Sequence, residues 1–261
     1  MHSASASPLE IAGVLLYHGS AMAPASSKPA KKNDTRETVK TLVIAVLLAL
    51  LFRSLVFEPF HIPSGSMKSN LLIGDYLFVT KFSYGYSHYS FPFGLAPISG
   101  RIFKSEPKRG DIVVFRPPGQ SGTDFIKRLI GLPGDRIQMR AGQLYINDRP
   151  VPKQYVDDWA DPDTPDSPPL GRYRETLPEG KSFLTLYEKI PLPADDTEVY
   201  TVPPGRYFFM GDNRDHSRDS RFADPVGFVP EENLIGRADL VLFSWAGGLS
   251  FRPDRFFLKL P

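Results

Sequence analysis

The stretch Thr123-Asp-Phe-Ile-Lys-Arg-Leu-Ile-Gly131, which Leu132-Pro-Gly-Asp135 follows directly, decides how the body of this chain folds. Its apolar side chains show no sustained 3.6-residue period, and a short apolar run before a Pro-Gly turn is typical of a β-strand. Alternation along a strand places Phe125, Lys127 and Leu129 on one face. The stretch therefore predicts a strand that carries a lysine on an apolar face.

Similar short runs of β-branched and aromatic residues recur on both sides of this stretch, each flanked by Gly, Pro, Asn or Asp. They are residues 75–80, 111–115, 143–146, 207–210 and 240–243. No stretch after residue 57 has a sustained helical period, so we expect a mainly β body. Six prolines and five aspartates make residues 150–169 too polar and broken for a core element. We therefore interpret residues 150–200 as an inserted, partly extended region.

The composition limits the chemistry. A chain of 261 residues with 41% hydrophobic, 12% aromatic and 23% charged residues is globular rather than disordered. Because it has no cysteine, disulfides, thiol catalysis and cysteine-ligated zinc or iron–sulfur clusters are excluded. A net charge of +2 gives no support for a nucleic-acid partner, so we expect none.

The most apolar segment is residues 41–57, where every residue from Leu42 to Phe52 is apolar. As a helix it is about 26 Å long, slightly less than the roughly 30 Å of a bilayer's hydrocarbon core. Arg53 lies near one end, where its side chain can reach the interface. The marginal length leaves a buried core helix open as an alternative. However, no amphipathic helices nearby offer it a matching core, which favours a membrane anchor.

Basic residues lie mainly before this segment and predict its orientation. They are Lys28, Lys31, Lys32, Arg36 and Lys40, and the next one after Arg53 is Lys68. The positive-inside rule then places the N-terminus in the cytoplasm. Glu58-Pro-Phe-His61 offers no small-x-small site close to the apolar run, so an uncleaved anchor is favoured over a cleaved signal peptide. We expect a disordered cytoplasmic tail over 1–40, a single transmembrane helix over 41–57 and an extracytoplasmic domain over 58–261.

The loop Gly211–Arg221 contains three arginines, three aspartates, an asparagine and two serines. A calcium loop fails on spacing, because position 6 counted from Asp212 is Ser217 and position 12 is Ala223. A solvated turn is the plain alternative. The density of polar groups favours a hydrogen-bonded scaffold that holds a few side chains at fixed geometry. The five histidines have no metal-ligand spacing, and there is no G-x-S-x-G elbow.

Two further features suggest nucleophilic chemistry, although each has a plain alternative. Ser64 and Ser66 flank Gly65, which would let the backbone approach a substrate carbonyl closely; the alternative is a Gly-Ser turn. A desolvated Lys127 would have a lowered pKa and a neutral amine that can accept a proton. The alternative is an edge-strand lysine with its ammonium in water.

Taken together, these segments closely resemble bacterial type I signal peptidases, from about Thr41 to Trp245. The motifs that carry the resemblance are Ile62-Pro-Ser-Gly-Ser-Met67, Leu71-Leu-Ile-Gly-Asp-Tyr76, Arg109-Gly-Asp-Ile-Val-Val-Phe115, Phe125–Asp135, Gly211–Arg221 and Val226-Gly-Phe-Val-Pro230. The resemblance implies a signal-peptidase-type fold of antiparallel β-sheets, with residues 150–200 as a smaller accessory β region. It implies no metal or cofactor.

The resemblance also implies roles for individual residues. Ser66 is expected to be the nucleophile and Lys127 the general base. Ser64 joins the Ser66 backbone N–H in an oxyanion hole, and Ser217 orients the lysine amine. The resemblance implies a supporting role for Asp219, Arg221, Asp212 and Arg214, the first two as an ion pair.

Substrate recognition follows from the same resemblance. The substrate would lie as an extended strand beside Ile62–Ser64 and Asp124–Ile126. The positions expected to bind it, mainly by lining shallow pockets for small residues at −1 and −3, are Phe60, Ile62, Pro63, Met67, Leu71, Asp124, Phe125 and Ile126. Lys68-Ser69-Asn70 and His216 depart from the common family pattern, which puts fine specificity in doubt.

The expected function is cleavage of signal peptides from preproteins, after an Ala-x-Ala type site, by an acyl-enzyme mechanism. The expected location is the inner membrane, with lipid bilayer and preprotein as partners and the catalytic domain in the periplasm. Two alternatives remain open. One is a Ser-Lys peptidase dedicated to a single substrate, and the other is an inactive β module that only binds signal peptides.

Overall fold

A computed structural model of the chain describes residues 35–55, 57–91, 97–119, 122–248 and 251–261. Most of the predicted tail, residues 1–34, lies outside the described residues. The chain divides into two units, Met1–Val43 and Ile44–Pro261, and all the described strands belong to the second.

Helix α1 spans Thr35–Leu55 and contains most of the predicted anchor. Its Leu- and Ala-rich composition favours a helix. Side chains from Leu42 to Leu51 are exposed. Among the described residues, no helix meets the length and apolarity needed to cross a membrane.

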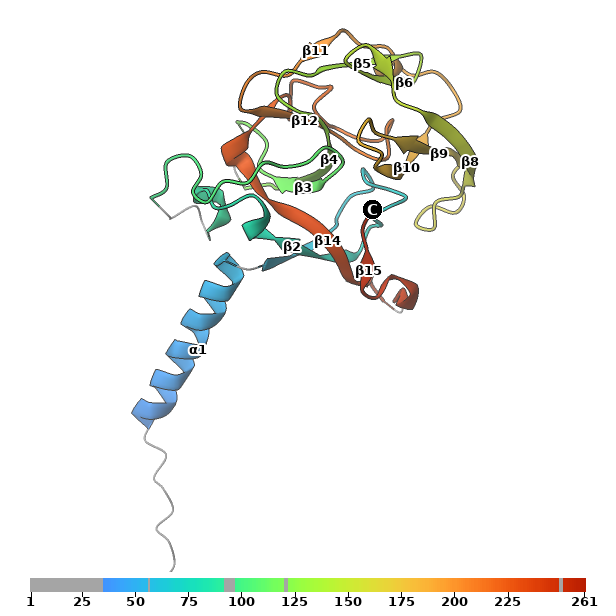
Figure 1. Cartoon of the computed structure of the whole chain (residues 1–261). Helices are drawn as coiled ribbons and strands as arrows, with labels where there is room; N and C mark the ends of the chain where they lie inside the picture. The colour runs from blue at the N-terminus through green and yellow to red at the C-terminus, as the bar shows by residue number, and fades with distance from the viewer. Residues whose placement is uncertain (1–34, 56, 92–96, 120–121, 249–250) are drawn as a thin grey trace, which may run out of the picture. The chain divides into compact units, whose positions relative to one another are not determined.

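The largest sheet is eight-stranded and antiparallel, with the order β1-β2-β14-β3-β4-β12-β13, and β15 pairs with β14 (Figure 1). Its strands are β1 (Phe57–His61), β2 (Asp75–Thr80), β3 (Ile112–Phe115), β4 (Phe125–Gly131), β12 (Arg206–Met210), β13 (Val229–Pro230), β14 (Leu234–Ser244) and β15 (Leu258–Lys259). Strand β4 therefore lies inside the sheet, between β3 and β12. This position explains how a lysine on β4 can be buried.

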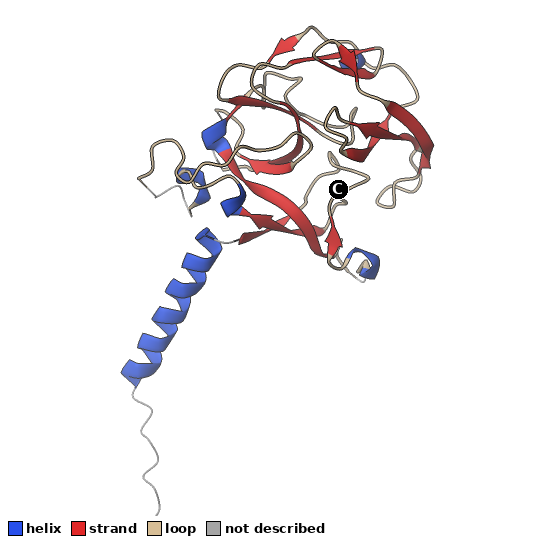
Figure 2. Ribbon diagram, in the orientation of Figure 1, coloured by secondary structure: helices blue, strands red, loops and turns tan. Residues whose placement is uncertain are grey.

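Two smaller sheets complete the body. One has the order β11-β5-β6-β7 and the other β10-β9-β8. Their strands are β5 (Arg136–Arg140), β6 (Gln143–Ile146), β7 (Arg149–Pro150), β8 (Lys153–Trp159), β9 (Leu170–Thr176), β10 (Ser182–Tyr187) and β11 (Tyr200–Thr201). Short 3₁₀ helices occupy Lys81–Ser83, His88–Ser90, Pro193–Asp195, Glu231–Asn233 and Pro253–Arg255. Figure 2 shows that strands and loops make up nearly all of the body.

The mainly β prediction is confirmed. The Thr123–Gly131 stretch and all five predicted runs contain strands, and no α-helix follows Leu55 in the described part of the chain. The Pro-Gly turn ends β4 as expected, because Gly134 adopts a positive φ of 89°. The Asp135 carboxylate closes this turn by accepting a 2.6 Å hydrogen bond from the Leu132 N–H.

The inserted region is a β region, but its second half is not peripheral. Leu177, Phe183 and Tyr187 are buried in the same cluster as Ile130 and Phe208 of the large sheet. By contrast, none of the residues of β8 is fully buried. The polar sequence of residues 150–169 predicted a segment outside the core, and Val151 is the one residue of this range that is buried in it, whereas residues 170–187 supply a larger part of the core.

Candidate active site

Ser66 and Lys127 lie within hydrogen-bond distance of each other. Lys127 is on β4 and Ser66 is in the segment between β1 and β2, and the lysine Nζ donates to the serine Oγ at 2.6 Å. The same Nζ donates to the Ile126 carbonyl at 3.0 Å. Both side chains are buried, with Ser66 8% and Lys127 4% exposed. The alternative in which the Lys127 ammonium lies in water is therefore wrong.

The environment of Lys127 favours the neutral amine. Burial lowers the pKa of Lys127 to about 8, although the carboxylates of Asp219 and Asp212 act in the opposite direction. The ring centroid of Phe125 lies 5.4 Å from Nζ on the same face of β4. A neutral amine beside a hydroxyl group is the arrangement that can activate a serine as a nucleophile.

The turn that carries Ser66 is held by the loop 211–221. The backbone N–H of Asn213 donates to the Ser66 carbonyl at 3.1 Å, and its Nδ2 donates to the Gly65 carbonyl at 3.1 Å. The Lys68 N–H also donates to the Gly65 carbonyl. Ser64 is exposed and lines the same cavity as Ser66.

Gly211 allows this loop to lie directly against the Ser66 turn. A Cβ at this position would lie 2.2 Å from Ser217 Oγ and 2.5 Å from the Ser66 carbonyl oxygen. Ser217 is buried beside Gly211, and the structure records no hydrogen bond between Ser217 and Lys127. The expected orienting contact of Ser217 with the amine is thus not formed in this geometry.

Asp219 and Arg221 form a buried ion pair within the loop. The Arg221 guanidinium donates to both carboxylate oxygens at 2.9 Å and also to the Arg214 carbonyl. The Gly211 N–H donates to Asp219 at 3.0 Å. Burial alone would raise the pKa of Asp219, but the charge and hydrogen bonds of Arg221 outweigh it and hold this pKa below its usual range. The solvated-turn alternative for this loop is therefore wrong.

Two more buried ion pairs anchor the loop to other strands. Asp212 accepts two 2.7 Å hydrogen bonds from Arg128 on β4, in a bidentate pair. Arg214 donates two 2.6 Å hydrogen bonds to Glu175 on β9. All four side chains are at most 1% exposed. The loop is thereby fixed both to the strand of Lys127 and to the inserted region.

The residues predicted to bind substrate separate into two sets. Ile62, Met67 and Leu71 are at most 2% exposed and pack in a core cluster, against which Phe60 and Ile126 are half-buried. The others lie nearer the surface: Phe125 lines the active-site cavity, Pro63 is exposed, and Asp124 accepts a 2.6 Å hydrogen bond from Arg116.

The strand edge predicted to receive substrate has a partner on one side only. Residues Phe125–Lys127 pair with β3, whereas β12 pairs with β4 only from Arg128 onward. The backbone of Ile62 is already bonded to Asp75 and Gly74. The region of β4 around Lys127 thus keeps a sheet edge beside the serine.

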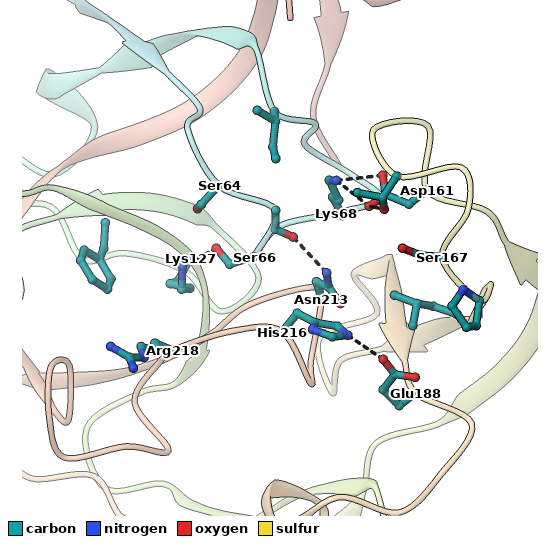
Figure 3. Close-up of a pocket in the computed structure, with 16 residues that line it drawn as sticks. Ser64, Ser66, Lys68, Lys127, Asp161, Ser167, Glu188, Asn213, His216 and Arg218 are labelled. Atoms are coloured by element: carbon teal, nitrogen blue, oxygen red, sulfur yellow. Dashed lines mark hydrogen bonds and ion pairs between the residues drawn. The ribbon is translucent and has the colours of Figure 1, made fainter.

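A cavity of about 660 Å³ lies over the two residues (Figure 3). In the close-up, Ser66 lies between Ser64 and Lys127 on one side and Asp161, Ser167 and Glu188 on the other. His216 faces Glu188, with 2.7 Å between Nε2 and Oε1. Within the described ranges, no three His, Asp or Glu side chains gather closely enough to hold a metal ion.

Residues 35–245 match the family model described as "Signal peptidase, peptidase S26". The chain belongs to this family. Two relatives named signal peptidase I are 44% identical (Rickettsia akari, strain Hartford) and 45% identical (Rickettsia canadensis, strain McKiel) over 226 residues. Each alignment covers 82% of this chain and 83% of the relative. A solved signal peptidase I from Enterococcus faecalis V583 is 30% identical and covers 51% of this chain and 97% of its own, with a TM-score of 0.29.

Membership of the signal peptidase family confirms the resemblance found in the sequence. The sequence reasoning nevertheless missed Arg128, Glu175, Tyr187 and Asn70. Tyr187 donates to Glu175 at 2.6 Å, and Asn70 donates to Asp212 at 2.7 Å. The signal available in the sequence was the large number of charged residues in the loop 211–221. It implied partners outside the loop without identifying them.

Replacing Glu175 by Gln should destabilise the protein strongly, because the buried Arg214 would lose the charge that compensates it. Breaking such a buried pair costs about 3 kcal/mol or more in the free energy of unfolding. Urea denaturation of the full chain in detergent measures this change. The matched control is Asp158→Asn. Asp158 lies on β8 and forms a half-exposed ion pair with Lys189, so losing its charge should leave stability unchanged. Equal effects of the two substitutions would contradict the anchoring role of Glu175.

Proposed function

We propose that this chain is a membrane-bound serine endopeptidase that removes signal peptides with a Ser66–Lys127 dyad. The observation that carries the proposal is the 2.6 Å hydrogen bond between the buried Lys127 amine and the Ser66 hydroxyl. A lysine 4% exposed, with its pKa lowered to about 8, can act as a base near physiological pH.

In the first step, Ser66 Oγ attacks the carbonyl carbon of the scissile peptide bond while Lys127 Nζ takes the hydroxyl proton. The carbonyl oxygen becomes an oxyanion. The Ser66 backbone N–H and the Ser64 hydroxyl are the donors that would stabilise it. Both belong to the turn that Asn213 holds through the Gly65 and Ser66 carbonyls.

In the second step, the ammonium of Lys127 returns its proton to the leaving nitrogen, and the peptide bond breaks. The mature protein leaves with a free amino terminus, and the signal peptide stays esterified to Ser66. Lys127 then takes a proton from a water molecule that attacks the ester. As the ester bond breaks, Lys127 gives this proton to Ser66 Oγ, so the signal peptide leaves with a new carboxyl group and the Ser66 hydroxyl is regenerated.

The loop 211–221 supports this chemistry by position and by charge. Asp219 and Asp212 raise the pKa of Lys127 and so limit the effect of burial. Asp219, Arg221, Asp212 and Arg214 are therefore positioning residues. Ser217 would orient the amine of Lys127 through its hydroxyl group, which lies beside Gly211.

The substrate would add as an extended strand beside Phe125–Lys127 and the Ile62–Ser64 segment. Pro63 and Asp124 flank this path. Its pockets would be shallow because Ile62, Met67 and Leu71 already fill the space beneath Phe60 and Ile126. Shallow apolar pockets exclude large side chains, which fits small residues at −1 and −3.

The apolar residues 41–57, which the sequence predicts as a transmembrane segment, would anchor the enzyme in the membrane that holds its substrates. The basic residues before Leu42 favour a cytoplasmic N-terminus, an inner-membrane location and a periplasmic catalytic domain. An inactive binding module is disfavoured, because burying a lysine is costly and binding alone does not need it.

Substitution of either dyad residue should abolish cleavage. We expect Ser66→Ala and Lys127→Met each to lower kcat/KM on a preprotein by at least about a thousandfold, because the nucleophile or its base is lost. Lys127→Arg should be equally inactive, since a guanidinium stays protonated. Lys189→Met, at an exposed ion pair of the inserted region, is the control and should retain activity. Substantial cleavage by the Ser66 or Lys127 variants would refute the dyad.

The dyad also predicts the acid limb of the pH–rate profile. Only the neutral amine accepts a proton, and its fraction rises with pH until the pKa of about 8 is passed. We therefore expect kcat/KM to rise about tenfold per pH unit below this value and to level off above it. Initial rates between pH 5 and pH 10 on a short peptide substrate measure this limb. A limb centred near the usual pKa of histidine would point to another base.

A further inference from the structure

The active-site cavity continues beyond Ser66, on the side away from Ser64 and Lys127 (Figure 3). Its far wall is the loop between β8 and β9, which supplies Asp161, Thr164, Ser167 and Pro168. The whole cavity, at about 660 Å³, is too large for one side chain. It also lies on the opposite side of the nucleophile from the open edge of β4.

Lys68 fastens this loop to the turn that carries Ser66. Its Nζ contacts Asp161 Oδ1 and Oδ2 at 2.8 and 2.7 Å, and Asp163 Oδ2 at 2.8 Å. The side chain of Lys68 is 5% exposed. A Cβ on Gly65 would lie 3.1 Å from Lys68 Cε, so the lysine stem also packs closely on the backbone between the two serines.

Further contacts make the loop a fixed wall. Asp163 accepts a hydrogen bond from Arg252, whose other nitrogen donates to the Ile73 carbonyl at 2.8 Å. The Asp161 carboxylate also accepts from the Asp163 N–H at 3.0 Å and from the Thr164 hydroxyl at 2.9 Å. The carboxylates of Asp161 and Asp163 are thus neutralised by the cationic side chains of Lys68 and Arg252. The side of the loop that faces the cavity remains exposed at Ser167.

The expected path of the substrate leads through the far half of the cavity. A strand beside Phe125–Lys127 delivers its last residue to Ser66, so the chain after the scissile bond must continue past the nucleophile. We propose that the far half of the cavity binds the first residues of the mature protein, with Lys68 as the positioning residue for its wall. This inference rests on the proposed function.

The lining of the far half indicates which residues it would favour. Ser167 presents a hydroxyl, and Glu188 presents a carboxylate that is 29% exposed and contacts His216. In the far half of the cavity, Lys68 and Arg252 neutralise the carboxylates of Asp161 and Asp163, whereas Glu188 is paired only with the imidazole of His216. The site should therefore prefer a basic over an acidic side chain shortly after the scissile bond.

The full-length enzyme in detergent can be tested with matched peptides. All share one sequence up to the scissile bond. The short substrate has only a chromogenic amide after it, and the long ones carry four residues with lysine or glutamate at the second position. We expect wild type to cleave the long lysine peptide better than the short substrate, and about fivefold better than the glutamate peptide. Glu188→Gln should remove most of that fivefold preference.

Two wall variants test the geometry. Lys68→Met should lower the long-to-short ratio of kcat/KM about tenfold, mainly through KM, and Lys68→Arg should restore part of it. Ser167→Trp fills the site from an exposed position, so it should also lower the long-to-short ratio. Its effect does not depend on whether the Lys68 variant folds. Gln154→Trp, exposed on β8 and outside the cavity, is its matched control.

The outcomes separate this inference from the proposed function. If Ser66→Ala still cleaves the short substrate, the proposed function fails. If wild type cleaves all substrates through Ser66 with the same kcat/KM, and neither Lys68→Met nor Ser167→Trp changes the ratio, only the subsite is overturned.

Discussion

The burial of one lysine amine beside one serine hydroxyl is the constraint on which the rest of this structure depends. Lys127 is 4% exposed and contacts Ser66 at 2.6 Å. Desolvation penalises the ammonium and lowers its pKa to about 8. A flexible site would let water reach the amine and remove this shift. The surrounding structure must therefore hold both side chains in place and keep the amine dry.

Three buried ion pairs meet this requirement, and two of them connect parts of the chain that lie far apart in sequence. Arg128–Asp212 ties the loop 211–221 to β4, Arg214–Glu175 ties it to β9, and Asp219–Arg221 closes it on itself. Buried pairs contribute little net stability, because desolvation offsets their attraction. Their use here is geometric, because each guanidinium is directed at one carboxylate and two of the pairs hold the loop against β4 and β9.

Alternation and turn residues predicted the strands, and the motif around Lys127 and Ser66 predicted residues that do lie together. The two long-range charge pairs were not predictable, because Arg128 and Asp212 are 84 residues apart, and Arg214 and Glu175 are 39 apart. Nothing local in a sequence indicates which aspartate meets which arginine. The core role of residues 170–187 was missed for a similar reason, since Phe183 is buried only after the inserted sheet packs on the main one.

The titration of Lys127 tests the account most directly. The ε-carbons of lysine can be labelled with ¹³C in the full-length protein, and the Lys127 signal is assigned by its absence from Lys127→Met. A pH titration followed by NMR then gives the pKa of this amine without any substrate. The account predicts a midpoint near 8, and a midpoint near the ordinary lysine value of 10.5 would contradict it.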